Sequence, residues 1–176
     1  MDQHPVMDSL LQAIGRLLGL PDLAWDEQLS CTLSFGDDVH LTLYADDEHP
    51  DLTIYTLIGE LPAESPADVW RELMEANLFG KGTGGATLGY EADSQWVYLT
   101  RRLPAEGLTA QQGLDEMQGF VAACRQWQTR WPQLQSRALA SAQPGDEPAR
   151  AGASVPPPAV SPADFRSRLE IGILRA

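Results

Sequence analysis

The residues whose types and spacing most suggest chemistry lie in residues 77–90, "NLFGKGTGGATLGY". This stretch contains five glycines and the only lysine of the chain, Lys81. Glycines at positions 80, 82 and 85 have the G-x-G-x-x-G spacing with which a backbone approaches a pyrophosphate. A dinucleotide site of that kind needs a strand before the glycines and a helix after them, so that the phosphate meets a helix N-terminus.

The flanking sequence argues against a phosphate site. A helical pattern precedes the glycines and a strand pattern follows them, so Gly80 is expected at a helix C-terminus, whose dipole repels anions. The Walker spacing also fails, because Lys81 is followed by Gly82 and Glu75 stands where the first glycine belongs. We expect a structural role, with Gly80 as a left-handed cap. Three further glycines, Gly84, Gly85 and Gly89, are expected to allow a tight entry into the next strand.

A second cluster of polar residues, "DDEHPD" at 46–51, offers hard ligands for a metal ion. The candidate ligands are Asp46, Asp47, Glu48, His49 and Asp51. The spacing lacks the alternating acidic positions, the glycine and the distant glutamate of a calcium loop, and Pro50 favours a turn. We therefore expect a solvated loop and no metal.

No catalytic motif is present: neither G-x-S-x-G nor H-E-x-x-H occurs. Cys31 and His40 fall on strands whose alternation places them on opposite faces, so they are not expected to pair. Cys31 and Cys124 both occupy apolar positions and are expected to be buried free thiols. The prediction is a protein with no catalytic residues and no cofactor.

Charge restricts the possible partners. The 176 residues include 12 Lys and Arg against 25 Asp and Glu, a net charge of −13, which repels phosphate backbones and anionic lipid surfaces. Nucleic acid and membrane are therefore not expected as partners. No apolar run approaches the 18 residues of a membrane span, and the first residues lack the basic charge of a secretory signal. We expect a soluble intracellular protein.

Hydrophobic periodicity predicts three helices and five strands. Apolar residues at three- and four-residue intervals indicate helices, with an N-cap at Ser65 and a Thr109–Gln112 capping box, and strict alternation indicates strands. Short turns between the strands require antiparallel pairing, so the fold class is α+β, a twisted antiparallel sheet packed by helices. The predicted order α-β-β-β-α-β-β-α corresponds to residues 6–20, 29–35, 39–44, 52–60, 66–78, 86–90, 95–103 and 109–134.

Composition changes near residue 137. Residues 1–136 carry 7 basic and 21 acidic side chains, whereas residues 137–176 carry 5 and 4 and are rich in Pro, Ala and Gly. We predict one domain over 1–136 and a flexible tail over 137–176, with polyproline character at 156–158. The final residues, "FRSRLEIGILRA", fit a short amphipathic turn, an interaction tail or a cloning remnant equally well.

Three stretches carry a resemblance to a known family: "LLGLPDLAWDEQLSCTLSFGDDVHLTLY", "IGELPAE" and "ANLFGKGTGGATLGY". In this order they resemble the CesT/Tir family of type III secretion chaperones, the class I effector chaperones, over about residues 7–132. The resemblance implies a small acidic homodimer without catalysis in the bacterial cytoplasm. It would hold the N-terminal chaperone-binding segment of a secreted effector in extended form, soluble and competent for export, and a contact with the secretion ATPase stays open.

The resemblance also implies two sets of site residues. In family members the first helix and neighbouring sheet surface form the effector-binding patches, and the second helix with the following strand builds the dimer. The residues expected to bind an effector are Leu11, Ile14, Leu18, Leu33, Phe35, Leu43, Trp96 and Tyr98. Those expected at the dimer interface are Trp70, Leu73, Met74, Asn77 and Leu78.

Two other functions stay open at this level. One is a non-catalytic adaptor or regulator of the same fold that binds a secretion-system component. The other is a small phosphate-binding enzyme that uses residues 80–85. Each apolar stripe is also compatible with a purely structural role in the core of one domain.

Overall fold

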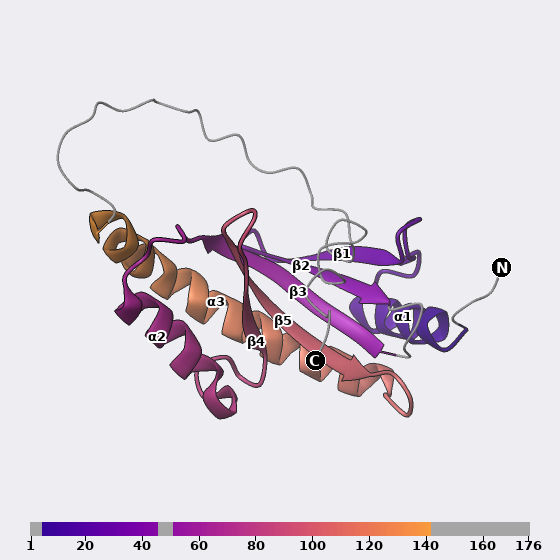
Figure 1. Cartoon of the computed structure of the whole chain (residues 1–176). Coiled ribbons are helices and arrows are strands. Elements are labelled where there is room, and N and C mark those ends of the chain that lie inside the picture. Colours follow the sequence, from indigo (N-terminus) through magenta and orange to yellow (C-terminus); the bar gives the residue numbers. More distant parts are fainter. Residues whose placement is uncertain (1–4, 46–50, 142–176) are drawn as a thin grey trace, which may run out of the picture.

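The computed structural model describes residues 5–45 and 51–141 (Figure 1). Three α-helices, one short 3₁₀ helix and five strands follow one another along these residues. Their bounds are α1 Pro5–Leu18, β1 Ser30–Phe35, β2 Val39–Ala45, β3 Asp51–Glu60, α2 Ala67–Asn77, η1 Leu78–Gly80, β4 Thr87–Glu91, β5 Trp96–Pro104 and α3 Ala110–Ser141. The predicted order of elements is confirmed.

The strands form one antiparallel sheet in the order β1-β2-β3-β5-β4. Strands β1 and β4 are therefore the two edges. The long helix α3 runs behind the sheet in Figure 1, α1 lies near the β1–β2 end, and α2 lies beside β4 at the other end. The predicted α+β class with an antiparallel sheet is confirmed.

A single hydrophobic core lies between the sheet and the helices. Phe120 and Trp127 of α3 and Ile14 of α1 are fully buried there. They pack in one cluster with Leu43 of β2 and Ile54 of β3, which are also fully buried. Each such side chain stabilises the fold by about 1.5–3 kcal/mol because it leaves water. The apolar stripes of the helices therefore hold the helices against one side of the sheet.

The two predicted helix caps have different outcomes. At α3, Gln112 N–H donates to Thr109 Oγ1 at 3.2 Å and Thr109 N–H donates to Gln112 Oε1 at 3.0 Å, which confirms the capping box. At α2, the prediction of a Ser65 cap is wrong. Ser65 is buried, and its hydroxyl donates to the Pro62 carbonyl at 2.5 Å in the preceding turn, so the helix begins at Ala67 without a side-chain cap.

Helix α3 is longer than the periodicity predicted, because it continues to Ser141. Leu134 and Ala138 extend its buried stripe, and Arg137 holds the last turns to α2 by ion pairs with Asp68 at 3.4 Å and Glu72 at 2.9 Å. The predicted domain boundary at residue 136 therefore falls inside this helix.

Gly59 of β3 lies against Trp131 of α3, next to a register shift between Leu57 and Gly59. A Cβ built at Gly59 would overlap the indole of Trp131. Gly59→Ala should therefore lower the free energy of unfolding by about 1–3 kcal/mol through overpacking, measured by urea denaturation.

Gly89 in β4 is the matched control, because an added Cβ there meets no atom within 4 Å. Gly89→Ala should leave stability unchanged or raise it by about 0.5 kcal/mol. Equal stability of the Gly59→Ala variant and the wild-type chain would contradict the packing described.

Candidate partner-binding surfaces

The glycine-rich loop is a packing element. It follows α2 and η1 and precedes β4, and Gly80, Gly84 and Gly85 have positive φ angles of 65°, 61° and 86°. The Trp127 indole N–H of α3 donates to the carbonyl of Gly82 at 2.9 Å, which fixes the loop to the core. Gly80 has the predicted left-handed conformation, but it lies at the end of η1. The cap of α2 is Leu78, in an extended conformation, so the prediction that Gly80 caps this helix is wrong. Gly89 has no positive φ and open space around it, so the strand entry does not need a glycine there.

The cysteine, histidine and acidic side chains considered as candidates for catalysis or metal binding do not come together in one site. Cys31 faces the core, whereas His40 is exposed on the opposite face, with its Nδ1 2.9 Å from the Ser34 hydroxyl. Most of the acidic loop lies outside the described residues, and its last member, Asp51, pairs with Arg102 at 3.2 Å. Within residues 5–45 and 51–141, no group of three or more His, Cys, Asp or Glu side chains is placed to hold a metal ion.

Both cysteines are free and buried, as predicted. Burial raises the pKa of the Cys31 and Cys124 thiols, so less of each is thiolate at neutral pH. Both should react with a maleimide on the order of 100-fold more slowly in the folded protein than in urea. Mass spectrometry of Cys31→Ser and Cys124→Ser variants assigns each rate. A thiol that reacts at the unfolded rate without denaturant would refute its burial.

The structure divides the predicted effector-binding residues between two sides of the sheet. Four of them lie in the core: Leu11, Ile14, Leu33 and Leu43, at 2%, 0%, 4% and 0% exposure. Leu18 and Phe35 are half-buried at the margin of that core. Trp96 and Tyr98 lie on the opposite side of the sheet. The eight residues therefore do not form one surface.

Helix α1 presents an apolar surface that the sequence analysis did not single out. Val6 and Leu17 are 58% and 52% exposed, and eleven residues, close to three helical turns, place them on one line of the helix. A groove of about 510 Å³ lies beside Val6, between α1 and the loop before α3, and both Ala13 and Leu108 line it. Leu17 lies within the predicted helix 6–20, three residues after Ile14, but periodicity does not show which apolar residues are covered.

The two edges of the sheet differ. At β4, the Asn77 side chain of α2 accepts from Leu88 N–H at 2.8 Å and donates to Leu88 C=O at 3.0 Å, which occupies that edge at Leu88. At β1, Asp26 binds the outward backbone groups of Ser30: the Ser30 N–H donates to Asp26 Oδ1 at 2.8 Å, and the Ser30 C=O accepts from Asp26 N–H at 2.8 Å. Because outward backbone groups alternate along a strand, the N–H and C=O groups of Thr32 and Ser34 face away from β2.

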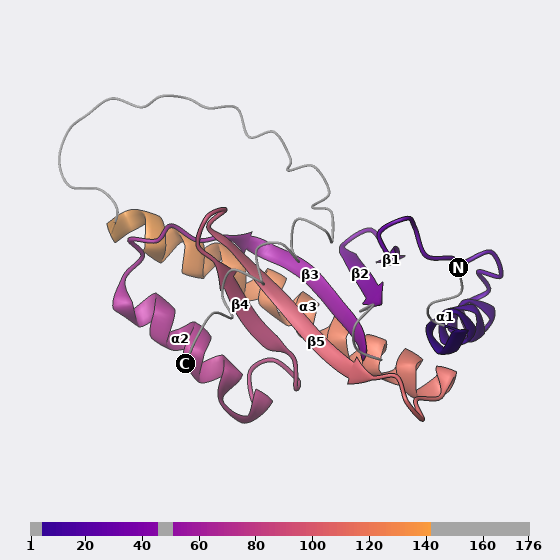
Figure 2. The ribbon, with the colours of Figure 1, turned by 45° about the vertical axis from the view of Figure 1, so that its right-hand side comes forward.

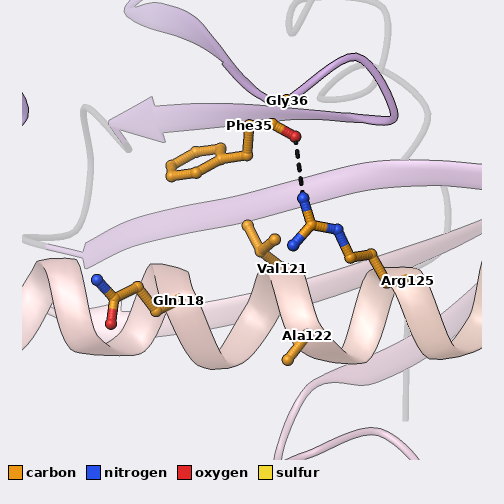
Figure 3. A pocket seen from close by; sticks show the side chains of 6 residues that line it. All are labelled: Phe35, Gly36, Gln118, Val121, Ala122 and Arg125. Atoms are coloured by element: carbon orange, nitrogen blue, oxygen red, sulfur yellow. Dashed lines mark hydrogen bonds between the residues drawn. The ribbon is translucent and has the colours of Figure 1, made fainter.

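A surface pocket of about 320 Å³ opens at the end of this β1 edge (Figure 3). Phe35 forms one wall, and Val121 and Ala122 of α3 form the other. Arg125 crosses its rim, donating to the Phe35 carbonyl at 3.3 Å and pairing with Asp38 at 2.8 Å. The hydrogen bond from Arg125 lowers the pKa of the Asp38 carboxyl, so the pair stays charged at neutral pH.

The residues predicted for the dimer interface differ in their surroundings. Met74 and Leu78 are 69% and 56% exposed, Leu73 is buried, and Asn77 holds the edge of β4. The Trp70 ring packs edge-on against Tyr90, with ring centroids 4.7 Å apart.

Phe79, which the sequence analysis did not include, is the most exposed large apolar side chain of the described residues, at 85%. Its φ of 55° follows the end of α2. Two exposed apolar surfaces thus stand out, one on α1 and one on α2 with η1.

Comparison with known proteins identifies the class. Residues 9–128 match the Tir chaperone protein (CesT) family, and the chain belongs to this family. Among its relatives are the Tir chaperones of Citrobacter freundii, 25% identical over 112 residues, and of Escherichia coli, 26% identical over 113 residues. These alignments cover 64% of this chain and 70% of each relative.

Solved structures with a similar fold agree with this family assignment. A chain of the HopA1–SchA chaperone–effector complex matches with a TM-score of 0.61 and 22% identity, over 73% of this chain and 97% of that one. The protein is thus a type III secretion effector chaperone, of a family that is not catalytic. Among the described residues, no helix is long and apolar enough to cross a bilayer.

Proposed function

We propose that this chaperone binds the N-terminal segment of a secreted effector as an extended strand added to β1. The observation that carries the proposal is the difference between the edges: Asn77 closes β4 at Leu88, whereas β1 presents the backbone of Thr32 and Ser34 outward. Main-chain hydrogen bonds at a sheet edge bind an extended peptide without requiring a folded epitope.

Apolar surface next to this edge supplies side-chain contacts. The pocket between Phe35 and Val121 begins where β1 ends, so a side chain of an added strand would enter it (Figure 3). The exposed Leu17 and the half-buried Leu18 would extend the surface along α1. Leu11, Ile14, Leu33 and Leu43 would then act indirectly, by holding α1 and β1 in place from the core.

The effector segment would remain extended and soluble in the bacterial cytoplasm until export. An acidic surface with a net charge of −13 keeps a protein with exposed apolar patches in solution. The matching chain of similar fold comes from a structure described as the HopA1–SchA chaperone–effector complex, which agrees with this role. A contact with the secretion ATPase stays a prediction of the family resemblance.

We further propose a homodimer through α2 and η1. Met74, Leu78 and Phe79 place three large apolar side chains in water on one short segment, which is unusual for a monomer. Trp70 and Leu73 would support this surface through their contacts within the subunit.

Strand addition is tested by removing one outward N–H group. Thr32→Pro deletes a donor that faces away from β2, a position where an edge strand tolerates proline. We expect it to weaken binding of the N-terminal 100 residues of a co-expressed effector by roughly tenfold, the loss of about 1–2 kcal/mol of hydrogen bonding, measured by calorimetry.

Thr32→Ala retains the N–H and is the matched control, expected to bind as the wild-type chain does. Ala122→Glu should also weaken binding by filling the pocket, and Gln126→Glu, on the same helix and exposed, should not. Unchanged affinity of the folded Thr32→Pro variant would refute strand addition at β1.

The dimer is tested with Met74→Glu combined with Phe79→Glu. Both side chains are exposed, so the subunit should fold normally, while two carboxylates in an apolar interface should separate the subunits. Light scattering should give 19.2 kDa for this variant and twice that value for the wild-type chain. Leu139→Glu, at an exposed apolar position of α3, should leave the mass unchanged.

Chaperone and adaptor differ in what they do to the partner. Limited proteolysis of a co-purified complex should protect an N-terminal effector fragment of about 50–100 residues that has no fold of its own, with two chaperones per fragment. Protection of the partner only as an intact folded domain would favour the adaptor.

A further inference from the structure

The first residue of β1 is bonded to the loop that precedes it. This loop, residues 19–29, runs from α1 to β1 at the end of the sheet away from α2 (Figure 2). Within it, the Asp26 N–H donates to the Ser30 carbonyl at 2.8 Å, and Asp26 Oδ1 accepts from the Ser30 N–H at 2.8 Å. Asp26 therefore binds the two backbone groups of Ser30 that one residue of a neighbouring antiparallel strand would bind.

Further hydrogen bonds hold the Asp26 carboxylate in this position. The Ser30 hydroxyl donates to Oδ2 at 2.6 Å, and the Gln28 N–H donates to Oδ1 at 2.9 Å. Burial opposes ionisation of Asp26, but the hydrogen bonds from Ser30 and Gln28 outweigh it and lower the pKa of this carboxyl, so it is charged at neutral pH.

An added strand gains nothing by displacing Asp26. It would replace the two bonds to the Ser30 backbone with two bonds of its own, and the bond from the Ser30 hydroxyl to Asp26 would be lost. The bonds of Asp26 also lie within one short loop, so they order less chain than bonds to a separate molecule do. A strand that pairs with β1 is therefore expected to stop before Ser30.

We propose that Asp26 is a positioning residue for the bound effector segment, because it confines strand addition to Thr32 and Ser34 and turns the segment off the sheet before Ser30. This inference rests on the proposed strand addition at β1 and defines its extent. The other limit is the hairpin turn, since β1 ends at Phe35 and Gly36 has a φ of 68°. Thr32 and Ser34 each present one N–H and one C=O outward, so the effector backbone would bind these four groups and no others of β1.

A short paired stretch suits a chaperone that must release its partner. Each main-chain bond replaces a bond with water, so a few such bonds add little affinity, and few must break at release. Most of the affinity would then come from side-chain contacts, such as the pocket beside Phe35. The other edge uses the same device, because Asn77 binds both backbone groups of Leu88 in place of a strand.

The test compares hydrogen exchange at single amides of the full-length chaperone, free and bound to the N-terminal segment of a co-expressed effector. In the wild-type chain, binding should protect Thr32 and Ser34 and leave Ser30 unchanged. Asp26→Ala frees the Ser30 N–H, so Ser30 should exchange faster in the free variant and become protected on binding, as the effector strand extends to it. Dissociation of the effector segment should slow by roughly fivefold, the factor expected for one added hydrogen bond.

Two further variants are the controls. Asp26→Asn retains an oxygen acceptor for the Ser30 N–H and should restore the wild-type protection pattern and dissociation rate. Asp22→Ala removes the same charge from an exposed position of the same loop and should also behave as the wild-type chain does. Asp26 is exposed, so its variants should fold, which thermal unfolding checks, and each protection is a comparison of one variant with itself.

Three outcomes would overturn the proposal. The first is a Ser30 amide that stays unprotected in the bound Asp26→Ala variant while Thr32 and Ser34 are protected, which would leave strand addition at β1 intact. The second is unchanged or faster dissociation from the Asp26→Ala variant, as expected if Asp26 only held the loop. The third is a lack of protection at Thr32 and Ser34 in the wild-type complex, which would refute strand addition at β1 as well.

Discussion

The packing of α3 across one side of the sheet is the contact on which the rest of this structure depends. Phe120 and Trp127 bury their rings against the central strands, and α1 and α2 complete the same core at its two ends. The Trp127 N–H also binds the carbonyl of Gly82, so the glycine-rich loop is held by the helix that organises the core. Gly80 and Gly82 therefore serve close packing, because a Cβ at either position would lie within 3 Å of the neighbouring backbone.

Because all the helices pack on one side of the sheet, the two edge strands have different surroundings. Helix α2 packs beside β4, and Asn77 uses that proximity to bind both backbone groups of Leu88. No equivalent side chain reaches Thr32 among the described residues, because α3 passes beneath β1 and contributes Val121 and Arg125 to a pocket at its end. The asymmetry between the edges thus follows from where the helices lie, and it is this asymmetry that directs an added strand to β1.

The sequence predicted the elements well because their signals are local. The alternation in β1 and β2 and the three- and four-residue repeats of the helices each depend only on neighbouring residues. The capping box at Thr109 was predictable for the same reason. The Ser65 cap was not, because its hydroxyl had a competing acceptor in the Pro62 carbonyl, which only the folded turn brings within 2.5 Å.

The candidate site was harder to predict, since a periodic stripe does not say what covers it. Ile14 and Leu17 belong to one apolar repeat of α1, yet the first is fully buried and the second is 52% exposed. Likewise, Trp96 and Leu43 are both apolar strand residues, but the register places them on opposite sides of the sheet. Phe79 lacked a usable signal, because its exposure depends on a left-handed backbone at the end of α2.

The separation of the apolar surfaces lets their proposed roles coexist. The α1 surface and the β1 edge lie at one end of the sheet, and α2, which carries Met74 and is followed by Phe79 in η1, lies beside β4 at the other (Figure 1). A subunit joined through α2 would therefore leave its β1 edge free for an extended partner. In a two-fold dimer the two β1 edges would lie at the far ends of the assembly, so one effector segment that contacts both must pass along the intervening surface. That path favours a long, unfolded segment over a compact domain, because an extended chain gains about 3.3 Å of reach with each residue.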